Sequence, residues 1–214
     1  MITVEEALST ILNEIRPLGL ESTDIFGALG RVLGSDVKAE RSNPPWDNSA
    51  MDGYAIRHAD ISGASFQTPV TLKVIYDLPA GQVPAGPVGR GEAVRIMTGA
   101  PVPDGADAVV MVEKTEPCEG GVIMAEPARA GDNIRKAGED FRPGDTVISA
   151  GSLIRPAEAG MLATIGAPFV SVYRRPRVAV LSTGDELCDV SEVPPPGKIS
   201  NSNGYALSAL VIEA

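Results

Sequence analysis

Apolar residues near the N-terminus recur every three or four positions, at 4, 7, 8, 11, 12 and 15. This spacing places them on one face of an α-helix. Thr3 and Glu6 stand where a capping box would satisfy two backbone N–H groups at the start of such a helix. We therefore predict an N-terminal helix that ends before Pro17. A second, short helix is predicted over 24–33, with Gly34 as its left-handed cap.

From residue 41 the pattern changes to short apolar runs between turns. The runs cover 70–76, 93–97, 108–112 and 121–124, and glycine, proline and aspartate residues separate them. Short runs of branched residues bounded by such turn residues are typical of strands. We predict a small β-rich domain over 41–137.

The residues that follow the β-rich stretch again combine strand and helix. A strand is predicted over 145–148, and a helix is predicted over 156–165 with proline in its first turn and Gly166 after its end. The economical arrangement is one small domain built from 1–40 plus 138–175, which carries 41–137 as an insertion.

The final segment, 176–214, has the pattern of an α/β domain. The run Val178-Ala179-Val180-Leu181 suits a strand buried on both faces of a parallel sheet, and a loop and a helix over 205–214 follow. A parallel strand needs a returning neighbour. We therefore expect further sequence or another chain to complete this domain, and favour a truncated chain. The predicted fold is mixed α and β with several domains, of which the last is an incomplete α/β domain.

Composition and charge exclude several classes of protein. The net charge of −10 argues against a general nucleic-acid binder. The two cysteines, Cys118 and Cys188, are far apart, which fits neither a disulfide framework nor a zinc site but suits a reducing cytoplasm. No apolar run has the length of a membrane span, and the N-terminus does not read as a signal peptide. We expect a cytoplasmic protein whose single histidine, His58, is solvated.

The most specific motif is the segment 43–55, Asn-Pro-Pro-Trp-Asp-Asn-Ser-Ala-Met-Asp-Gly-Tyr-Ala. Its prolines and the Asp52-Gly53 pair favour, on their own, a structural turn that enters a strand. The whole string resembles the signature of the MoeA family, the molybdopterin molybdenumtransferases, which the E domain of gephyrin shares. The resemblance implies that Asp52 is a catalytic carboxylate, and Ser49 is a candidate substrate contact.

A second segment, 95–110, also matches this family. From its residues alone it is a hairpin around a Pro-Asp-Gly turn. Thr98 comes at the end of the first strand, where a hydroxyl could hold an anion or a water molecule. The resemblance implies that Thr98 belongs to the active cleft.

The third matching segment is 134–141, Ile-Arg-Lys-Ala-Gly-Glu-Asp-Phe. Arg135 and Lys136 could meet an oxyanion, and Asp140 could position a metal ion or a base. A solvated charged turn explains Arg135, Lys136 and Glu139 equally well. By the resemblance, Asp140 is a catalytic candidate.

The loop over 182–187 occupies a place where α/β proteins bind ligands, beyond the carboxyl end of a predicted strand. Its hydroxyls suit phosphate and its acids suit Mg²⁺. The loop resembles the start of the family's molybdopterin-binding fold, which implies a catalytic role for Glu186 and makes Asp185 and Glu186 candidate Mg²⁺ ligands. The candidate substrate contacts here are Ser182, Thr183, Gly184, Asn201 and Ser202.

The resemblance implies a homodimer that inserts molybdate into adenylylated molybdopterin with release of AMP, with molybdopterin adenylyltransferase as its partner in the pathway. It also implies that Asp52 and Thr98 face Glu186 of the partner subunit, so this chain alone is expected to be inactive. A non-catalytic dimeric scaffold, like the gephyrin E domain, is the alternative. The residues ahead of Val178 argue against a single-domain adenylyltransferase.

Overall fold

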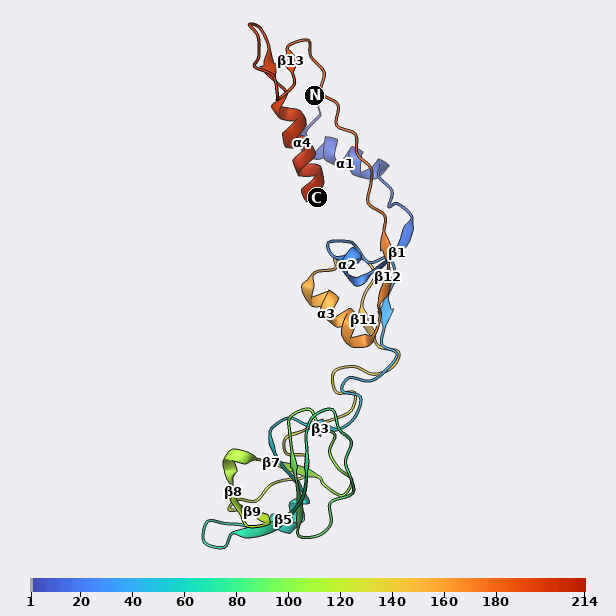
Figure 1. Ribbon diagram of the computed structural model, residues 1–214. Helices are drawn as coiled ribbons and strands as arrows, with labels where there is room; N and C mark the ends of the chain where they lie inside the picture. Colours follow the sequence, from blue (N-terminus) through green and yellow to red (C-terminus); the bar gives the residue numbers. More distant parts are fainter. Residues whose placement is uncertain (1) are drawn as a thin grey trace. The chain divides into compact units, whose positions relative to one another are not determined.

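The computed structural model describes residues 2–214, which form two compact units. One unit contains the chain up to Glu21 together with Tyr173–Ala214, and the other contains Ser22–Val172. The fold is mixed α and β, as predicted (Figure 1). None of the helices in residues 2–214 combines the length and the apolar character that a membrane span requires.

A six-stranded mixed sheet forms the β-rich part of Ser22–Val172, in the order β7-β4-β6-β5-β9-β8. Its strands are β4 (Gly53–Ile56), β5 (Val70–Leu78), β6 (Glu92–Ile96), β7 (Ala108–Met111), β8 (Thr115–Cys118) and β9 (Gly121–Met124). Neighbouring strands are antiparallel except β5 and β6, which run parallel. The four apolar runs of the sequence are β5, β6, β7 and β9, so these strand predictions are confirmed.

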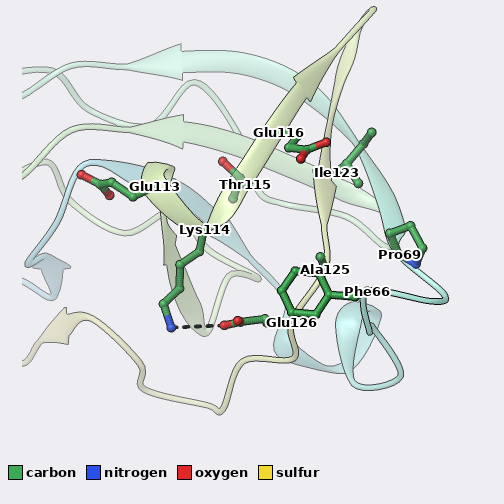
Figure 2. Close-up of a pocket in the computed structure, with 9 residues that line it drawn as sticks. All are labelled: Phe66, Pro69, Glu113, Lys114, Thr115, Glu116, Ile123, Ala125 and Glu126. Atoms are coloured by element: carbon green, nitrogen blue, oxygen red, sulfur yellow. Dashed lines mark hydrogen bonds and ion pairs between the residues drawn. The ribbon is translucent and has the colours of Figure 1, made fainter.

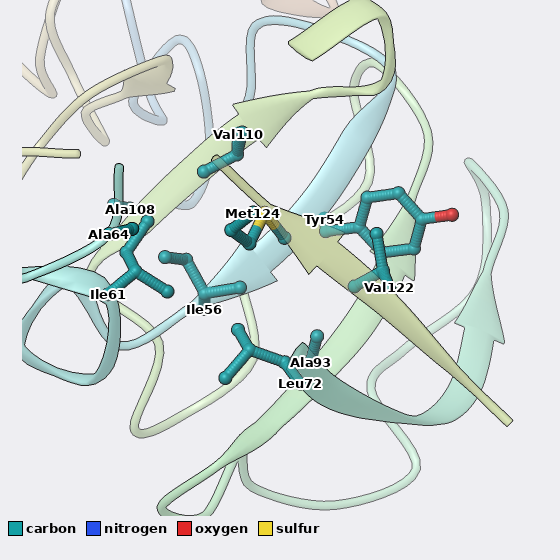
Figure 3. Close-up of a cluster of buried hydrophobic side chains, with 10 residues drawn as sticks. All are labelled: Tyr54, Ile56, Ile61, Ala64, Leu72, Ala93, Ala108, Val110, Val122 and Met124. Carbon is teal, nitrogen blue, oxygen red and sulfur yellow. The ribbon is translucent and has the colours of Figure 1, made fainter. Parts of the chain in front are cut away.

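Strand β4 is covered by hydrophobic side chains on both faces of the sheet. Tyr54 and Ile56 pack with Met124 in one buried cluster (Figure 3). Ala55 packs with Ile96 in a second cluster. Because successive side chains of a strand point to opposite faces, every residue of β4 is buried. The last three residues of the signature segment, Gly53, Tyr54 and Ala55, are therefore part of the core.

A smaller core lies in the same unit, outside the sheet. Strand β2 (Val37–Lys38) pairs antiparallel with β11 (Thr146–Ile148), and α2 (Ile25–Ala28) packs against α3 (Pro156–Ile165). The buried members of this core are Ala28, Leu33, Ile148, Ile154, Leu162, Ile165, Val170 and Val172. Two segments that are distant in the sequence, before and after the sheet, therefore fold on each other.

Helix α3 has the bounds that its end signals predict. Pro156 is its first residue, and Glu158 Oε2 accepts a hydrogen bond from the Arg155 N–H at 3.0 Å. Gly166 follows the helix with φ 76° and leaves it in the left-handed conformation.

The helix predicted over 24–33 is wrong beyond Ala28. Asp24 caps α2 by accepting a hydrogen bond from Gly27 N at 2.7 Å, but the positive φ comes at Gly30. The backbone there bonds across the fold instead: Gly30 N donates to Ile154 O at 2.8 Å. Long-range hydrogen bonds thus replace the helical ones that local propensity favoured.

Several short elements complete the larger unit. They are β3 (Asn48–Ser49), β10 (Ile134–Arg135), and the 3-10 helices η1 (His58–Ile61) and η2 (Val112–Lys114). Strand β3 pairs antiparallel with β10, which ties the loop before β4 to the chain that leaves the sheet. Strand β1 (Leu20–Asp24) pairs with β12 (Phe169–Tyr173).

The other unit contains α1 (Val4–Glu14), α4 (Ser202–Glu213) and the parallel pair β13 (Leu187–Cys188) and β14 (Ile199–Ser200). The predicted capping box of α1 is present. Thr3 Oγ1 accepts from Glu6 N at 3.1 Å, and Glu6 Oε2 accepts from Thr3 N at 2.9 Å. Helix α4 begins three residues before the predicted 205–214, because Asn201 caps it.

The run predicted as a strand over 178–181 forms no strand within residues 2–214. Leu181 is 87% exposed, and the run pairs with no described strand. A parallel strand is stabilised by hydrogen bonds to its neighbours, and no segment of residues 2–214 supplies them here. The run lies instead beside Leu207 and Leu210 of α4. The domain boundaries 1–40 plus 138–175, 41–137 and 176–214 stay a prediction.

Candidate functional site

Asp52 and Thr98 are brought together by the pairing of β4 with β6. The two strands are antiparallel, with Gly53 opposite Ile96, so the residue before β4 meets the residues that follow β6. Asp52 Oδ1 accepts two hydrogen bonds from Thr98, one from the backbone N–H and one from the hydroxyl, each at 2.7 Å. Two residues that are 46 positions apart thus form one exposed polar site.

This pairing defines the charge and the orientation of Asp52. The Thr98 N–H and then the Thr98 hydroxyl hold the pKa of Asp52 below its ordinary value of 3.8, and the nearby Arg95 charge lowers it further. Oδ2 accepts no hydrogen bond from residues 2–214. The site therefore presents one oriented, ionised carboxylate oxygen to solvent.

The same geometry limits what Thr98 can bind. A threonine hydroxyl has one proton to donate, and here Asp52 accepts it. An anion at Thr98 would find lone pairs rather than a donor, and it would face the Asp52 charge. The pair suits a cation, a water molecule or a hydrogen-bond donor of a ligand better than an oxyanion.

Ser49 lies beside this pair but beneath the surface. Its side chain is among the few buried polar ones, with 1% of the residue exposed. Its backbone N–H donates to Ala100 O at 3.0 Å, and its carbonyl accepts from Gly99 N at 2.8 Å. The predicted substrate contact at Ser49 stays a prediction. Its burial counts against direct contact with a ligand.

Asp140 lies in a different set of contacts, where the chain crosses between the sheet and the smaller core. Its Oδ2 accepts from Asn43 Nδ2 at 2.8 Å and from an Arg135 guanidinium nitrogen at 3.1 Å. Arg135 Nε also donates to Glu139 Oε1 at 2.6 Å. The catalytic role of Asp140 stays a prediction, and its carboxylate is already bound by two side chains of its own chain.

Lys136 and Asp47 form the other half of this arrangement. Lys136 Nζ donates to Asp47 Oδ2 at 2.7 Å, and Ala137 N donates to Asp47 Oδ1 at 2.9 Å. The Lys136 side chain and then the Ala137 N–H lower the pKa of Asp47. We call Asn43, Asp47, Arg135, Lys136, Glu139 and Asp140 the junction network. Its two cations, Arg135 and Lys136, pair with carboxylates of the same chain.

The loop over 182–186 and the start of α4 lie close together within the other unit. Asn201 Oδ1 accepts from Gly204 N at 3.0 Å, and a Cβ added at Gly204 would lie 3.1 Å from Ser182 Oγ. The Glu186 carboxylate folds back over Gly184, where any Cβ would collide with it. Thr183, Asp185 and Ser202 are exposed nearby in the chain. The roles of these residues stay predictions.

The sequence did not reveal one pair of polar side chains. His58 is partly exposed, yet its Nδ1 lies 2.6 Å from Asp107 Oδ2, and its backbone N–H donates to Asp107 Oδ1 at 2.7 Å. Burial acts to raise the pKa of Asp107, but the His58 N–H and ring outweigh it and lower that pKa. The pair ties η1 to the start of β7, and nothing in its spacing of 49 residues signals this contact.

A hollow of about 340 Å³ on the β-rich part contains none of the predicted site residues (Figure 2). Phe66, Ile123 and Ala125 give it an apolar wall, and Lys114 Nζ pairs with Glu126 Oε2 at 3.2 Å across its edge. The residues that line the hollow therefore include neither Asp52 nor Thr98.

Residues 2–166 match the family model described as "MoeA N-terminal region (domain I and II)". The chain is 40% identical to a molybdopterin molybdenumtransferase of Nostoc sp. over 215 residues, which is 99% of the chain and 49% of that protein. It is 42% identical to molybdopterin molybdenumtransferase 2 of Mycobacterium tuberculosis over 98% of the chain and 51% of that protein. The chain thus spans about half the length of the curated relatives it matches.

A crystal structure of the molybdopterin biosynthesis MoeA protein from Pyrococcus horikoshii has the same fold. The TM-score is 0.92 at 35% sequence identity, over all of this chain and 57% of that one. The similarity therefore includes residues 167–214, which the family model does not reach.

Proposed function

Because the chain belongs to the MoeA family, we propose that the full-length protein inserts molybdate into adenylylated molybdopterin, with release of AMP, during molybdenum cofactor biosynthesis. The names of the relatives support the transfer of molybdenum to molybdopterin. The observation that carries it to this chain is the oriented Asp52 carboxylate, which lies within the family signature and is held by Thr98.

The chemistry of the reaction explains the residue types. The phosphate linkage to AMP and molybdate itself are both anionic, so a cation is needed to neutralise them and carboxylates are needed to hold that cation or a water. In this proposal Asp52 supplies one carboxylate oxygen through its outward Oδ2. Glu186 supplies another, and Ser182, Thr183 and Asn201 offer hydroxyl and amide groups to phosphate.

Mg²⁺ is the cation that we propose. Mg²⁺ prefers oxygen ligands and usually binds through one or two carboxylates together with substrate phosphates and water. The adjacent acids Asp185 and Glu186 fit that requirement by type. Within residues 2–214 there is no group of three His, Cys, Asp or Glu side chains that would hold a metal ion unaided. The proposal therefore makes the ion dependent on bound substrate.

The assembly and the surroundings belong to the same proposal. We infer a homodimer in which Asp52 acts with Glu186 of the partner subunit, and a molybdopterin adenylyltransferase that supplies the adenylylated substrate. A cytoplasmic location is supported by the two unpaired cysteines, Cys118 and Cys188. A non-catalytic scaffold of the gephyrin E-domain type is the alternative.

Release of AMP from adenylylated molybdopterin, measured with and without molybdate, tests the proposal on the full-length protein. We expect molybdate-dependent release by the wild type and a loss of about 100-fold or more in Asp52→Asn. Asp77→Asn is the matched control, because Asp77 is an exposed carboxylate of β5 in the same sheet. Dimers without AMP release would favour the scaffold, and full activity in Asp52→Asn would exclude the role of Asp52.

A further inference from the structure

The Ser49 hydroxyl makes two hydrogen bonds to the same residue, Met51. Ser49 Oγ donates to Met51 O at 2.5 Å and accepts from Met51 N at 3.3 Å. Met51 O belongs to the peptide bond between Met51 and Asp52. The hydroxyl therefore orients the peptide plane from which Asp52 departs.

The backbone of Ser49 holds the other partner of the site. Its carbonyl accepts from Gly99 N at 2.8 Å, and Gly99 N belongs to the peptide bond that follows Thr98. Its own N–H donates to Ala100 O at 3.0 Å. Ser49 is thus hydrogen-bonded to the peptide group that precedes Asp52 and to the peptide group that follows Thr98.

Ser49 is placed to act on the site without touching a ligand. Only 1% of the residue is exposed, and the single proton of its hydroxyl is donated to Met51. A substrate could reach neither the donor nor much of the oxygen. A buried hydroxyl needs hydrogen-bond partners within the protein, and Met51 supplies both of them.

We propose that Ser49 is a positioning residue that sets the Asp52 carboxylate against Thr98, and that it does not bind substrate itself. The catalytic consequence of this role rests on the proposed function. The positioning itself does not, because it is a property of the folded chain.

A core-packing role would also explain a buried serine, but the two roles differ in what they change. Loss of packing lowers the free energy of unfolding and leaves the folded site intact. Loss of positioning weakens the two hydrogen bonds from Thr98 to Asp52, and those bonds lower the pKa of the Asp52 carboxyl. The titration of Asp52 therefore separates the two roles.

The test is a carbon-13 NMR titration of the Asp52 carboxyl in this chain, comparing wild type with Ser49→Ala. We expect the pKa to lie below 3.8 in the wild type and to rise toward 3.8 in the variant. Tyr76→Phe is the control, since it removes a side-chain hydrogen bond of similar length, 2.6 Å to Gly86 O, from β5 of the same sheet. It should leave the titration of Asp52 unchanged.

Ser49→Cys keeps the test decisive if Ser49→Ala fails to fold. A thiol is a weaker donor in nearly the same space, so the Asp52 pKa should rise in this variant as well. An Asp52 titration identical to that of the wild type in either folded variant would overturn the proposal.

In the full-length enzyme, we expect Ser49→Ala to lower kcat by about 10- to 100-fold with little change in KM. A wild type without molybdate-dependent AMP release would refute the proposed function and leave the NMR result standing. If Ser49→Ala shifted the Asp52 pKa but left kcat unchanged, the positioning role would stand and its importance for catalysis would be overturned.

Discussion

Asp52 and Gly53 are neighbours in the chain with opposite surroundings. The Asp52 side chain is exposed and bonded to Thr98, whereas Gly53 is buried where β4 passes β7. A Cβ on Gly53 would overlap the Val110 carbonyl oxygen. Close packing against β7 therefore explains the glycine of the signature, and the hydrogen bonds from Thr98 to its carboxylate explain the aspartate before it.

Gly53→Ala should destabilise the β-rich sheet by about 2–3 kcal/mol, because backbone atoms of β7 would have to move aside. Gly63→Ala is the matched control, since no atom lies within 4 Å of the added Cβ. Urea unfolding of both variants measures the difference. Equal midpoints for the two variants would contradict the close approach of β4 and β7.

At the scale of elements, local signals succeeded where both ends of an element were marked. Helix α3 has proline at its start and Gly166 at its end, and it has the predicted bounds. Helix α2 is shorter than predicted, because the backbone at Gly30 bonds to Ile154. Such a bond depends on a residue more than a hundred positions away, so no local signal reports it.

Gly160, inside α3, and Gly166, directly after its end, should respond to alanine in opposite ways. Gly166→Ala should cost about 1 kcal/mol of stability, because φ is 76° there and the added Cβ would crowd an Arg41 guanidinium nitrogen at 3.1 Å. Gly160→Ala should stabilise by about 0.5–1 kcal/mol, because the site is helical and open. Thermal unfolding measures both changes. A stabilising Gly166→Ala would show that the left-handed cap is absent.

At the scale of the whole larger unit, the junction network links two crossings of the chain between the sheet and the smaller core. Asp47 bonds to Lys136, and Asp140 bonds to Asn43 and Arg135, so the outgoing and returning segments are held together. These pairs are partly exposed, and their contribution to stability is therefore screened by solvent and salt.

The Asp47–Lys136 pair predicts acid sensitivity of this unit. The folded-state pKa of Asp47 lies below the ordinary value of 3.8, so its stabilisation is present above that value and is lost as pH falls through the folded pKa. The urea midpoint of Lys136→Met should therefore fall less between pH 6 and pH 3 than the midpoint of the wild type. Lys73→Met, at an exposed lysine of β5, should behave like the wild type. The same acid loss in all three proteins would exclude the pair as its source.

The sequence by itself determined those features that depend on near neighbours in the chain. The capping box of Thr3 and Glu6, the bounds of α3 and the strands β5, β6, β7 and β9 all follow from spacing, caps and turn residues. The residue types of the site were also readable from the sequence, because carboxylates and hydroxyls have the same chemistry in any fold. The strand predicted over 178–181 is not formed within residues 2–214, because a strand requires neighbours that its own residues do not specify.

Only the tertiary structure decided which side chains meet and what remains free on each. The register of β4 against β6 brings Thr98 to Asp52, uses the threonine proton and leaves one carboxylate oxygen outward. Burial of Ser49 turns a candidate ligand contact into a proposed positioning residue, and pairing within the junction network occupies Arg135 and Lys136. Hydrogen bonds and ion pairs between distant residues depend on distances of a few ångströms, which strand register and packing define and local sequence does not.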